Sequence, residues 1–126
     1  MLIVALIFAA LAALIHLYIF WLEAIAFEGP GRVVFGLSRE DAAVMKPVFY
    51  NQGFYNLFLA IGTTAGVGIM HASHASGGAL ITFGCGSMVL AALVLVTSDP
   101  SKRQAALVQG LCPAVALAFL GLSALS

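Results

Sequence analysis

Charged side chains are scarce in this sequence. Asp, Glu, Lys and Arg together make up 8% of the 126 residues, whereas hydrophobic residues make up 63%. A soluble domain carries about 25% charged residues because its surface faces water. The low charge excludes an ordinary soluble globule and indicates an integral membrane protein. The length leaves room for one domain, residues 1–126.

The sequence also lacks an excess of positive or negative charge, and it lacks a cysteine motif. Five basic residues balance five acidic ones, so the formal net charge is zero. Binding to nucleic acid needs a basic surface, and no nucleic-acid partner is therefore predicted. Cys85 and Cys112 lie in apolar runs without CxxC or CxxH spacing, a pattern typical of buried free thiols.

Long apolar runs are plentiful. A helix needs about 20 apolar residues to cross about 30 Å of hydrocarbon, and four runs reach that length: residues 2–26, 48–70, 78–97 and 104–124. The first run lacks the basic start and short apolar core of a signal peptide, so we interpret it as a retained transmembrane helix. The predicted fold is all-α, a bundle of four transmembrane helices.

The connections between these runs contain recognisable helix ends. The Gly-Pro-Gly of residues 29–31 is expected to break the first helix. Ser38, followed by acidic residues in the next turn, resembles an N-cap and predicts a short surface helix, Ser38 to Met45. Pro47 would then lie near the first turn of the second span. An Asp or Ser cap before Pro100 repeats the pattern in the third connection.

The basic residues predict the orientation of the chain. Three of them lie in the first connection and two in the third, namely Arg32, Arg39, Lys46, Lys102 and Arg103. The positive-inside rule then places both connections, and the surface helix, in the cytoplasm. We expect a multi-pass membrane protein with both termini on the non-cytoplasmic side.

Motifs of cofactor and metal chemistry are missing. His71 and His74 lie in the short HASHASGG connection, which is typical of a solvated turn. There is no HExxH, P-loop, dinucleotide fingerprint or nucleophile elbow. We therefore predict no metal site and no cofactor, and the sequence assigns no catalytic residue.

Polar side chains gather within the predicted spans at one depth. At 1.5 Å per residue, Asn51 to Asn56 occupy roughly the first 5 to 13 Å of the second span from its cytoplasmic end. The predicted site lies in the cytoplasmic half of the bundle interior and is formed by His16, Glu23, Asn51, Gln52, Tyr55, Asn56 and Gln109. Polar groups facing lipid are costly, which favours an interior position.

Two interpretations of this polar set remain open. Amides, Tyr and His commonly bond between transmembrane helices for about 0.6 to 2 kcal/mol each, and the set could serve only that purpose. However, an ionisable pair such as His16 and Glu23 below the membrane surface indicates a functional site. The first hypothesis is a pocket for a small amphiphile such as a lipid, quinone or metabolite, with enzymatic activity left open.

Glycine-rich faces favour two alternatives. Gly62 and Gly66 form a small-xxx-small pattern, and further glycines lie in the third run. Such faces let helices approach closely, either within one chain or between chains. The alternatives are an accessory subunit of a larger membrane complex without a ligand, and a small transporter built as a homodimer.

Four sequence motifs carry a family resemblance. HLYIFWLE is followed in order by VFGLS, NQGFYNLFLA and QGLCPA, from His16 to Ala114. These motifs resemble the family known as domain of unknown function thirteen-oh-four. The resemblance implies a small protein of the bacterial inner membrane with four helices, and it implies no established activity.

Overall fold

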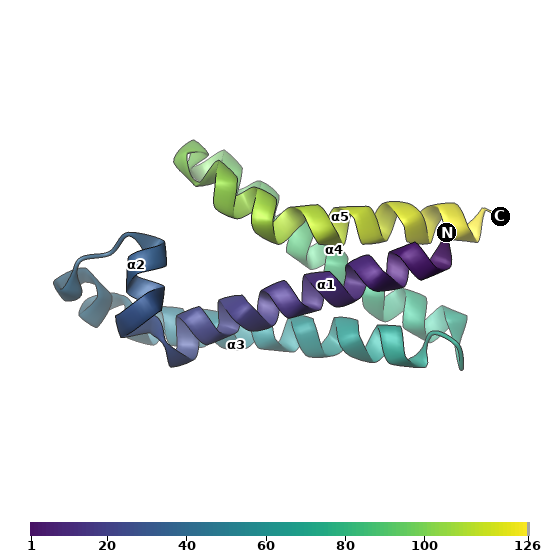
Figure 1. Cartoon of the computed structure of the whole chain (residues 1–126), viewed down its shortest axis with the longest axis horizontal. Coiled ribbons are helices and arrows are strands. Elements are labelled where there is room, and N and C mark those ends of the chain that lie inside the picture. The colour runs from purple at the N-terminus through teal and green to yellow at the C-terminus, as the bar shows by residue number, and fades with distance from the viewer. Residues whose placement is uncertain (126) are drawn as a thin grey trace.

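The computed structural model describes residues 1–125, and helices dominate this part of the chain (Figure 1). The long helices are α1 (Leu2–Phe20), α3 (Arg39–Ile69), α4 (His74–Ser98) and α5 (Arg103–Ala124). Shorter helical segments connect them: η1 (Trp21–Ile25), η2 (Phe27–Gly31), α2 (Arg32–Phe35) and η3 (Pro100–Lys102). The all-α prediction is confirmed.

The long helices pack in a ring, in which α1 contacts α3 and α5, and α4 contacts the same two helices. Both termini lie at one end of the molecule, which we call the terminal end, together with the turn between α3 and α4 (Figure 1). The opposite end holds α2, the start of α3 and η3. We call it the basic end, because the two connections that contain all five Lys and Arg residues lie there.

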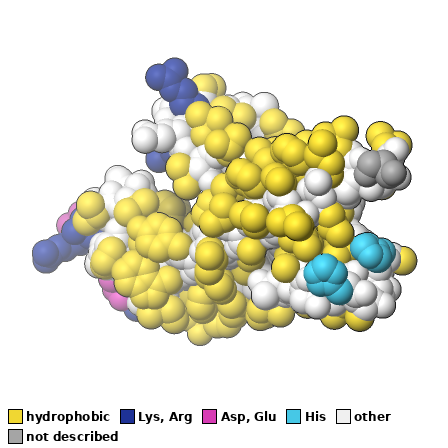
Figure 2. Space-filling model, turned by 45° about the vertical axis from the view of Figure 1, so that its right-hand side comes forward, with side chains coloured by type: hydrophobic (Ala, Val, Ile, Leu, Met, Phe, Trp, Pro, Cys, Tyr) yellow, Lys and Arg dark blue, Asp and Glu magenta, His cyan; other side chains and the backbone are white. Residues whose placement is uncertain are grey.

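The interior is made of small and medium side chains. The buried apolar cluster comprises Ala9, Ala12, Met70, Ile81, Cys85, Met88 and Ala116. Larger apolar side chains such as Phe58, Phe83 and Leu90 point outward, and hydrophobic atoms cover much of the surface in Figure 2. This inverted distribution suits a protein whose surroundings are acyl chains.

Glycines bring α3 and α4 into close contact near the terminal end. A Cβ added to Gly77 would lie 2.7 Å from the Met70 Cα and 2.9 Å from the Gly66 carbonyl oxygen. A Cβ at Gly84 would collide with the hydroxyl of Thr63, which is fully buried. These glycines therefore serve the packing of one chain with itself, the intramolecular use of a small-residue face.

Three of the predicted spans have counterparts. Within residues 1–125, the helices long and apolar enough to cross a membrane are Leu2–Ile25, His74–Ser98 and Pro100–Ala124. The predicted span 48–70 lies within α3, which does not qualify. Its polar residues and glycines lower its hydropathy, so the fold of four transmembrane helices is not confirmed.

The helix ends confirm two predictions and correct one. Ser38 caps α3 by accepting a 3.0 Å hydrogen bond from the Asp41 backbone N–H, and Asp99 caps η3 with Pro100 in its first turn. The prediction of a separate surface helix, Ser38 to Met45, was wrong. Its residues run on without a break into α3, and Pro47 lies inside that helix.

Candidate functional site

The end of α1 has an unusual backbone that holds Glu23. The chain continues from α1 into the π-helical turn η1, where the Ala26 N–H donates to the Trp21 carbonyl over 2.8 Å. The break predicted at residues 29–31 is present, because Gly29 has non-helical dihedral angles. The chain then folds back so closely that a Cβ on Gly31 would strike the Leu22 carbonyl oxygen. Such π-turns occur at the carboxyl-terminal ends of helices.

Glu23 is buried against α3, with 7% of its surface exposed. The Asn56 side-chain amide donates to Glu23 Oε2 over 2.8 Å and also to the Gln52 backbone carbonyl over 3.3 Å. Gly53 permits this approach, because a Cβ there would lie 3.0 Å from the Ala24 Cβ and 3.2 Å from the Glu23 Cβ. The fold therefore brings an acid and an amide from distant segments of the chain into direct contact.

His16 lies deeper in α1 and is almost completely buried, at 2% exposure. Its Nδ1 lies 2.9 Å from the Ala12 carbonyl oxygen. Since a carbonyl can only accept, Nδ1 carries a proton in that hydrogen bond. Glu23 is seven residues further along, or about 10 Å at 1.5 Å per residue. The two ionisable groups thus share the interior without forming a hydrogen-bonded pair.

The predicted lining is only partly formed. Asn51 and Tyr55 are exposed, Tyr55 at 57%. Each is two residues from Gly53, which faces α1, so each points about 160° away from it on a regular helix. Both side chains therefore lie on the outer face of α3 and not in the bundle interior, and a binding role for them stays a prediction. Gln52 is exposed too, but it is only about 40° from Asn56 on the helix.

Gln109 is half-buried on α5, four residues before Pro113. Proline has no N–H, so the Gln109 carbonyl lacks the donor it would have in a regular helix. Figure 1 shows the first part of α5 diverging from α1, and Figure 2 shows the surface hollowed between the two lobes of the basic end. We call this opening the basic-end crevice. Gln52, on the Asn56 side of α3, is exposed at the same end.

Sequence reasoning missed the aromatic cluster beside Glu23. The rings of Phe27 and Phe49 stack with centroids 4.5 Å apart, and Phe35 lies 5.0 Å from Phe49. Phe20 meets Phe54 edge to face at 5.3 Å. The phenylalanines are spread over four segments, so no sequence spacing marked them as one group. They surround the end of α1 with an apolar wall.

Arg32 was also missed as part of this region. Its Nη1 donates to the Leu37 carbonyl over 3.1 Å, whereas its buried Nε has no hydrogen-bond partner in the part of the chain that the structure describes. The bond closes the loop that follows α2, where Gly36 takes the left-handed conformation with φ of 67°. Such a conformation favours glycine.

Two cavities are found elsewhere in the molecule. One of about 630 Å³ lies at the terminal end among Met1, Met70, His74 and Leu120, and the other, of about 400 Å³, lies between α4 and α5. Neither is lined by the predicted site residues. Across residues 1–125, no three His, Cys, Asp or Glu side chains are grouped so that they could hold a metal ion.

Comparison with known proteins identifies the family of this chain. No curated protein and no solved structure matches it. The family model described as "Protein of unknown function (DUF1304)" matches residues 10–121. The matched segment contains η1, Glu23, Asn56 and Pro113, and the chain therefore belongs to this family of unknown function.

Proposed function

We propose that this protein binds a small amphiphilic ligand in the basic-end crevice, with the polar group of the ligand bonded to Glu23. The observation that carries the proposal is a carboxylic acid buried within a hydrophobic span and bonded to an amide instead of a cation. Ionisable groups at such depth are costly and usually functional. A ligand hydroxyl or ammonium group would supply a second donor.

The chemistry of the surrounding residues supports this choice. Asn56 bonds to Oε2, which leaves Oε1 for a ligand donor. Gln52 and Gln109 offer amides at the same end of the bundle, and the phenylalanines offer an apolar wall for a hydrocarbon or ring. Asn51 and Tyr55 point away from Gly53, so a role for them requires a ligand or partner on the outer face of α3.

The course of the chain supports a fourth crossing by α3. We infer that α1 ends in the same leaflet where α3 begins, and that α4 begins on the opposite side. If α1 and α4 both cross the bilayer, only α3 can return the chain between them. Its charged residues fall within Arg39–Lys46, so the remaining part can lie in hydrocarbon. The basic end would be cytoplasmic.

Cysteine labelling tests this topology. In a Cys85→Ala, Cys112→Ala background, His74→Cys should react with a membrane-impermeant maleimide on the non-cytoplasmic side. Glu40→Cys, an exposed position at the start of α3 at the basic end, should react only after the membrane is opened. Labelling of both positions from one side would remove the fourth crossing, and a reversed pattern would invert the orientation.

The ligand itself is tested by mass spectrometry of extracts from the purified protein. Wild type and Glu28→Gln should carry the same small molecule, and Glu23→Gln should lose it. Glu28 is a matched control, because it is an exposed carboxylate at the same end, paired with Lys46. Equal ligand content in Glu23→Gln and wild type, at equal thermal stability, would refute the proposal.

Open glycines favour a second candidate, an accessory subunit of a larger membrane complex. Gly62, Gly78, Gly86 and Gly121 have no heavy atom within 4 Å of an added Cβ, so their faces could take a neighbouring helix. In that case Gly62→Leu should abolish co-purification of a partner, while Glu23→Gln should leave it unchanged. Retention of the partner in Gly62→Leu, together with loss of the small molecule in Glu23→Gln, favours the ligand pocket.

A further inference from the structure

The groove between α4 and α5 is a second feature of the basic end. It has a volume of about 400 Å³, within the range typical of ligand sites. Small side chains leave it open, among them Ala92, Ala106 and Ala114. Gly110 closes its floor, because a Cβ there would lie 2.8 Å from the Ala92 Cβ. The remaining walls are formed mainly by Val and Leu side chains.

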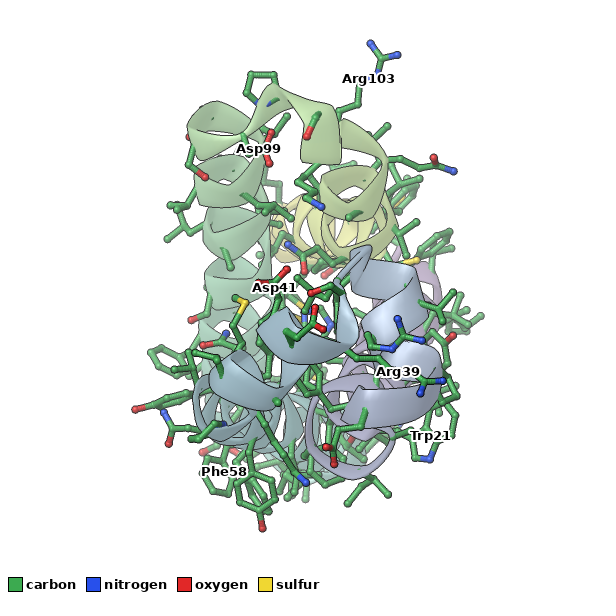
Figure 3. All side chains as sticks on the ribbon, turned by 90° about the vertical axis from the view of Figure 1, so that its left-hand side faces the viewer. Trp21, Arg39, Asp41, Phe58, Asp99 and Arg103 are labelled. Atoms are coloured by element: carbon green, nitrogen blue, oxygen red, sulfur yellow. The ribbon has the colours of Figure 1, made fainter. Side chains whose placement is uncertain are left out.

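A cation lies at the mouth of this groove. Arg103 belongs to its lining, and Figure 3 shows the guanidinium projecting beyond the ends of the helices. Lys102 precedes it. Long basic side chains of this kind keep their stems on apolar surface and their charge among lipid headgroups. Within residues 1–125 the ion pair found joins Lys46 to Glu28, so Arg103 has no acidic partner there.

The nearby carboxylate of Asp99 is already engaged. It accepts hydrogen bonds from the Ser101 hydroxyl over 2.6 Å and from the Ser101 N–H over 3.0 Å. These bonds, with a smaller contribution from Lys102, hold the pKa of Asp99 below its usual range. The turn therefore has two cations against one carboxylate, and it stays positive at neutral pH.

We propose that the groove between α4 and α5 binds one anionic phospholipid from the leaflet at the basic end. An acyl chain fills the apolar groove, and the phosphate group lies against Arg103. Basic residues beside an apolar groove at the membrane surface are the arrangement that recognises anionic headgroups. The planar guanidinium can donate two parallel hydrogen bonds to two oxygens of the phosphate, which fixes the orientation of the contact.

This lipid site is separate from the basic-end crevice. Leu107 and Leu111 line the groove, and each is two residues from Gln109. On a regular helix Gln109 therefore lies about 160° from both. The two sites are on opposite sides of α5, so the proposal does not depend on Glu23 or on the identity of its ligand.

Headgroup selectivity is tested with delipidated protein in detergent. Equal concentrations of dioleoylphosphatidylglycerol and dioleoylphosphatidylcholine are added, and single adducts are counted by native mass spectrometry. Wild type should prefer phosphatidylglycerol, and Arg103→Gln should reduce that preference about fivefold, the equivalent of one charge at the surface. Arg39→Gln, a cation at the same end outside the groove, should leave it unchanged. Equal binding of both lipids, or an equal loss in Arg39→Gln, overturns the proposal.

The acyl-chain position is tested by filling the groove. Ala114→Leu should reduce adducts of both lipids, because its side chain occupies the groove. Ala118→Leu is the matched control, since it is one turn further along α5, exposed, and outside the lining. Undiminished adducts in Ala114→Leu show that the chain does not lie in the groove. Loss of the phosphatidylglycerol preference in Glu23→Gln places the lipid in the crevice instead and also overturns the proposal.

Discussion

The two ends of this bundle differ in their residue types and in how closely their helices pack. At the terminal end, α3 and α4 touch through glycines and a buried threonine, and no Lys or Arg is present. At the basic end, α1 ends in a π-helical turn, α5 has a proline, and a buried acid bonds to an amide. Close helix contact at one end holds the bundle together, so the helices at the other end can separate around polar side chains.

The largest expected effect comes from adding one methyl group to the tightly packed end. Gly77→Ala places a Cβ against the Met70 backbone and the Gly66 carbonyl, so α4 must move away from α3. We expect a loss of about 1 to 3 kcal/mol in the free energy of unfolding. Thermal unfolding in detergent measures it.

Gly78→Ala is the matched control for that change, because nothing lies within 4 Å of its added Cβ. It makes the same chemical change in the same helix, and alanine is the better helix former by about 1 kcal/mol. The variant should be as stable as wild type or more stable. If Gly77→Ala and Gly78→Ala behave alike, glycine contact does not hold the terminal end together.

The bond between Glu23 and Asn56 should give an effect of comparable size. Asn56→Leu leaves the buried carboxylate without its amide donor, at a cost of about 1 to 3 kcal/mol. Adding Glu23→Leu removes the stranded acid, so the double variant should be more stable than the sum of the single changes predicts. A double-mutant cycle measures this coupling. Additive losses would mean that the two side chains do not act as a pair.

Most of the fold could be predicted from composition and helix ends. Apolar runs give the position of α1, α4 and α5, and the caps at Ser38 and Asp99 are local hydrogen-bond patterns. The course of α3 could not be predicted in this way. A proline inside a helix is costly, so Pro47 looked like a boundary, yet neighbouring groups in a membrane bundle often compensate for the lost bond.

The sequence predicted which polar residues form the candidate site, but it did not predict which of their helix faces meets α1. The spacing of Asn51 with Tyr55 and of Gln52 with Asn56 gives two helix faces, and spacing alone cannot say which one meets α1. Gly53 decides it, because only the face with the smallest residue lets α3 approach Glu23 so closely. This signal was present in the sequence and would have assigned Asn51 and Tyr55 to the outer face.

A smaller effect on stability, with a clear effect on shape, is expected from Pro113→Ala. The restored N–H can bond to the Gln109 carbonyl, which offsets the lost packing of the buried ring to within about 1 kcal/mol. The first part of α5 should then straighten toward α1 and narrow the crevice. Spin labels at residues 39 and 101, in a cysteine-free background, should move closer. An unchanged distance would assign the divergence of α5 to another cause.

The smallest effect is expected at the exposed ion pair of the basic end. Lys46 Nζ lies 2.5 Å from Glu28 Oε2, but both side chains are more than half exposed. Water and salt screen such pairs, which contribute about 0.2 to 1 kcal/mol. Lys46→Gln should therefore lower the thermal midpoint only slightly, and the difference should vanish in high salt. A loss as large as that of Asn56→Leu would mean that this surface contact, and not the buried acid, holds the end of α1 against α3.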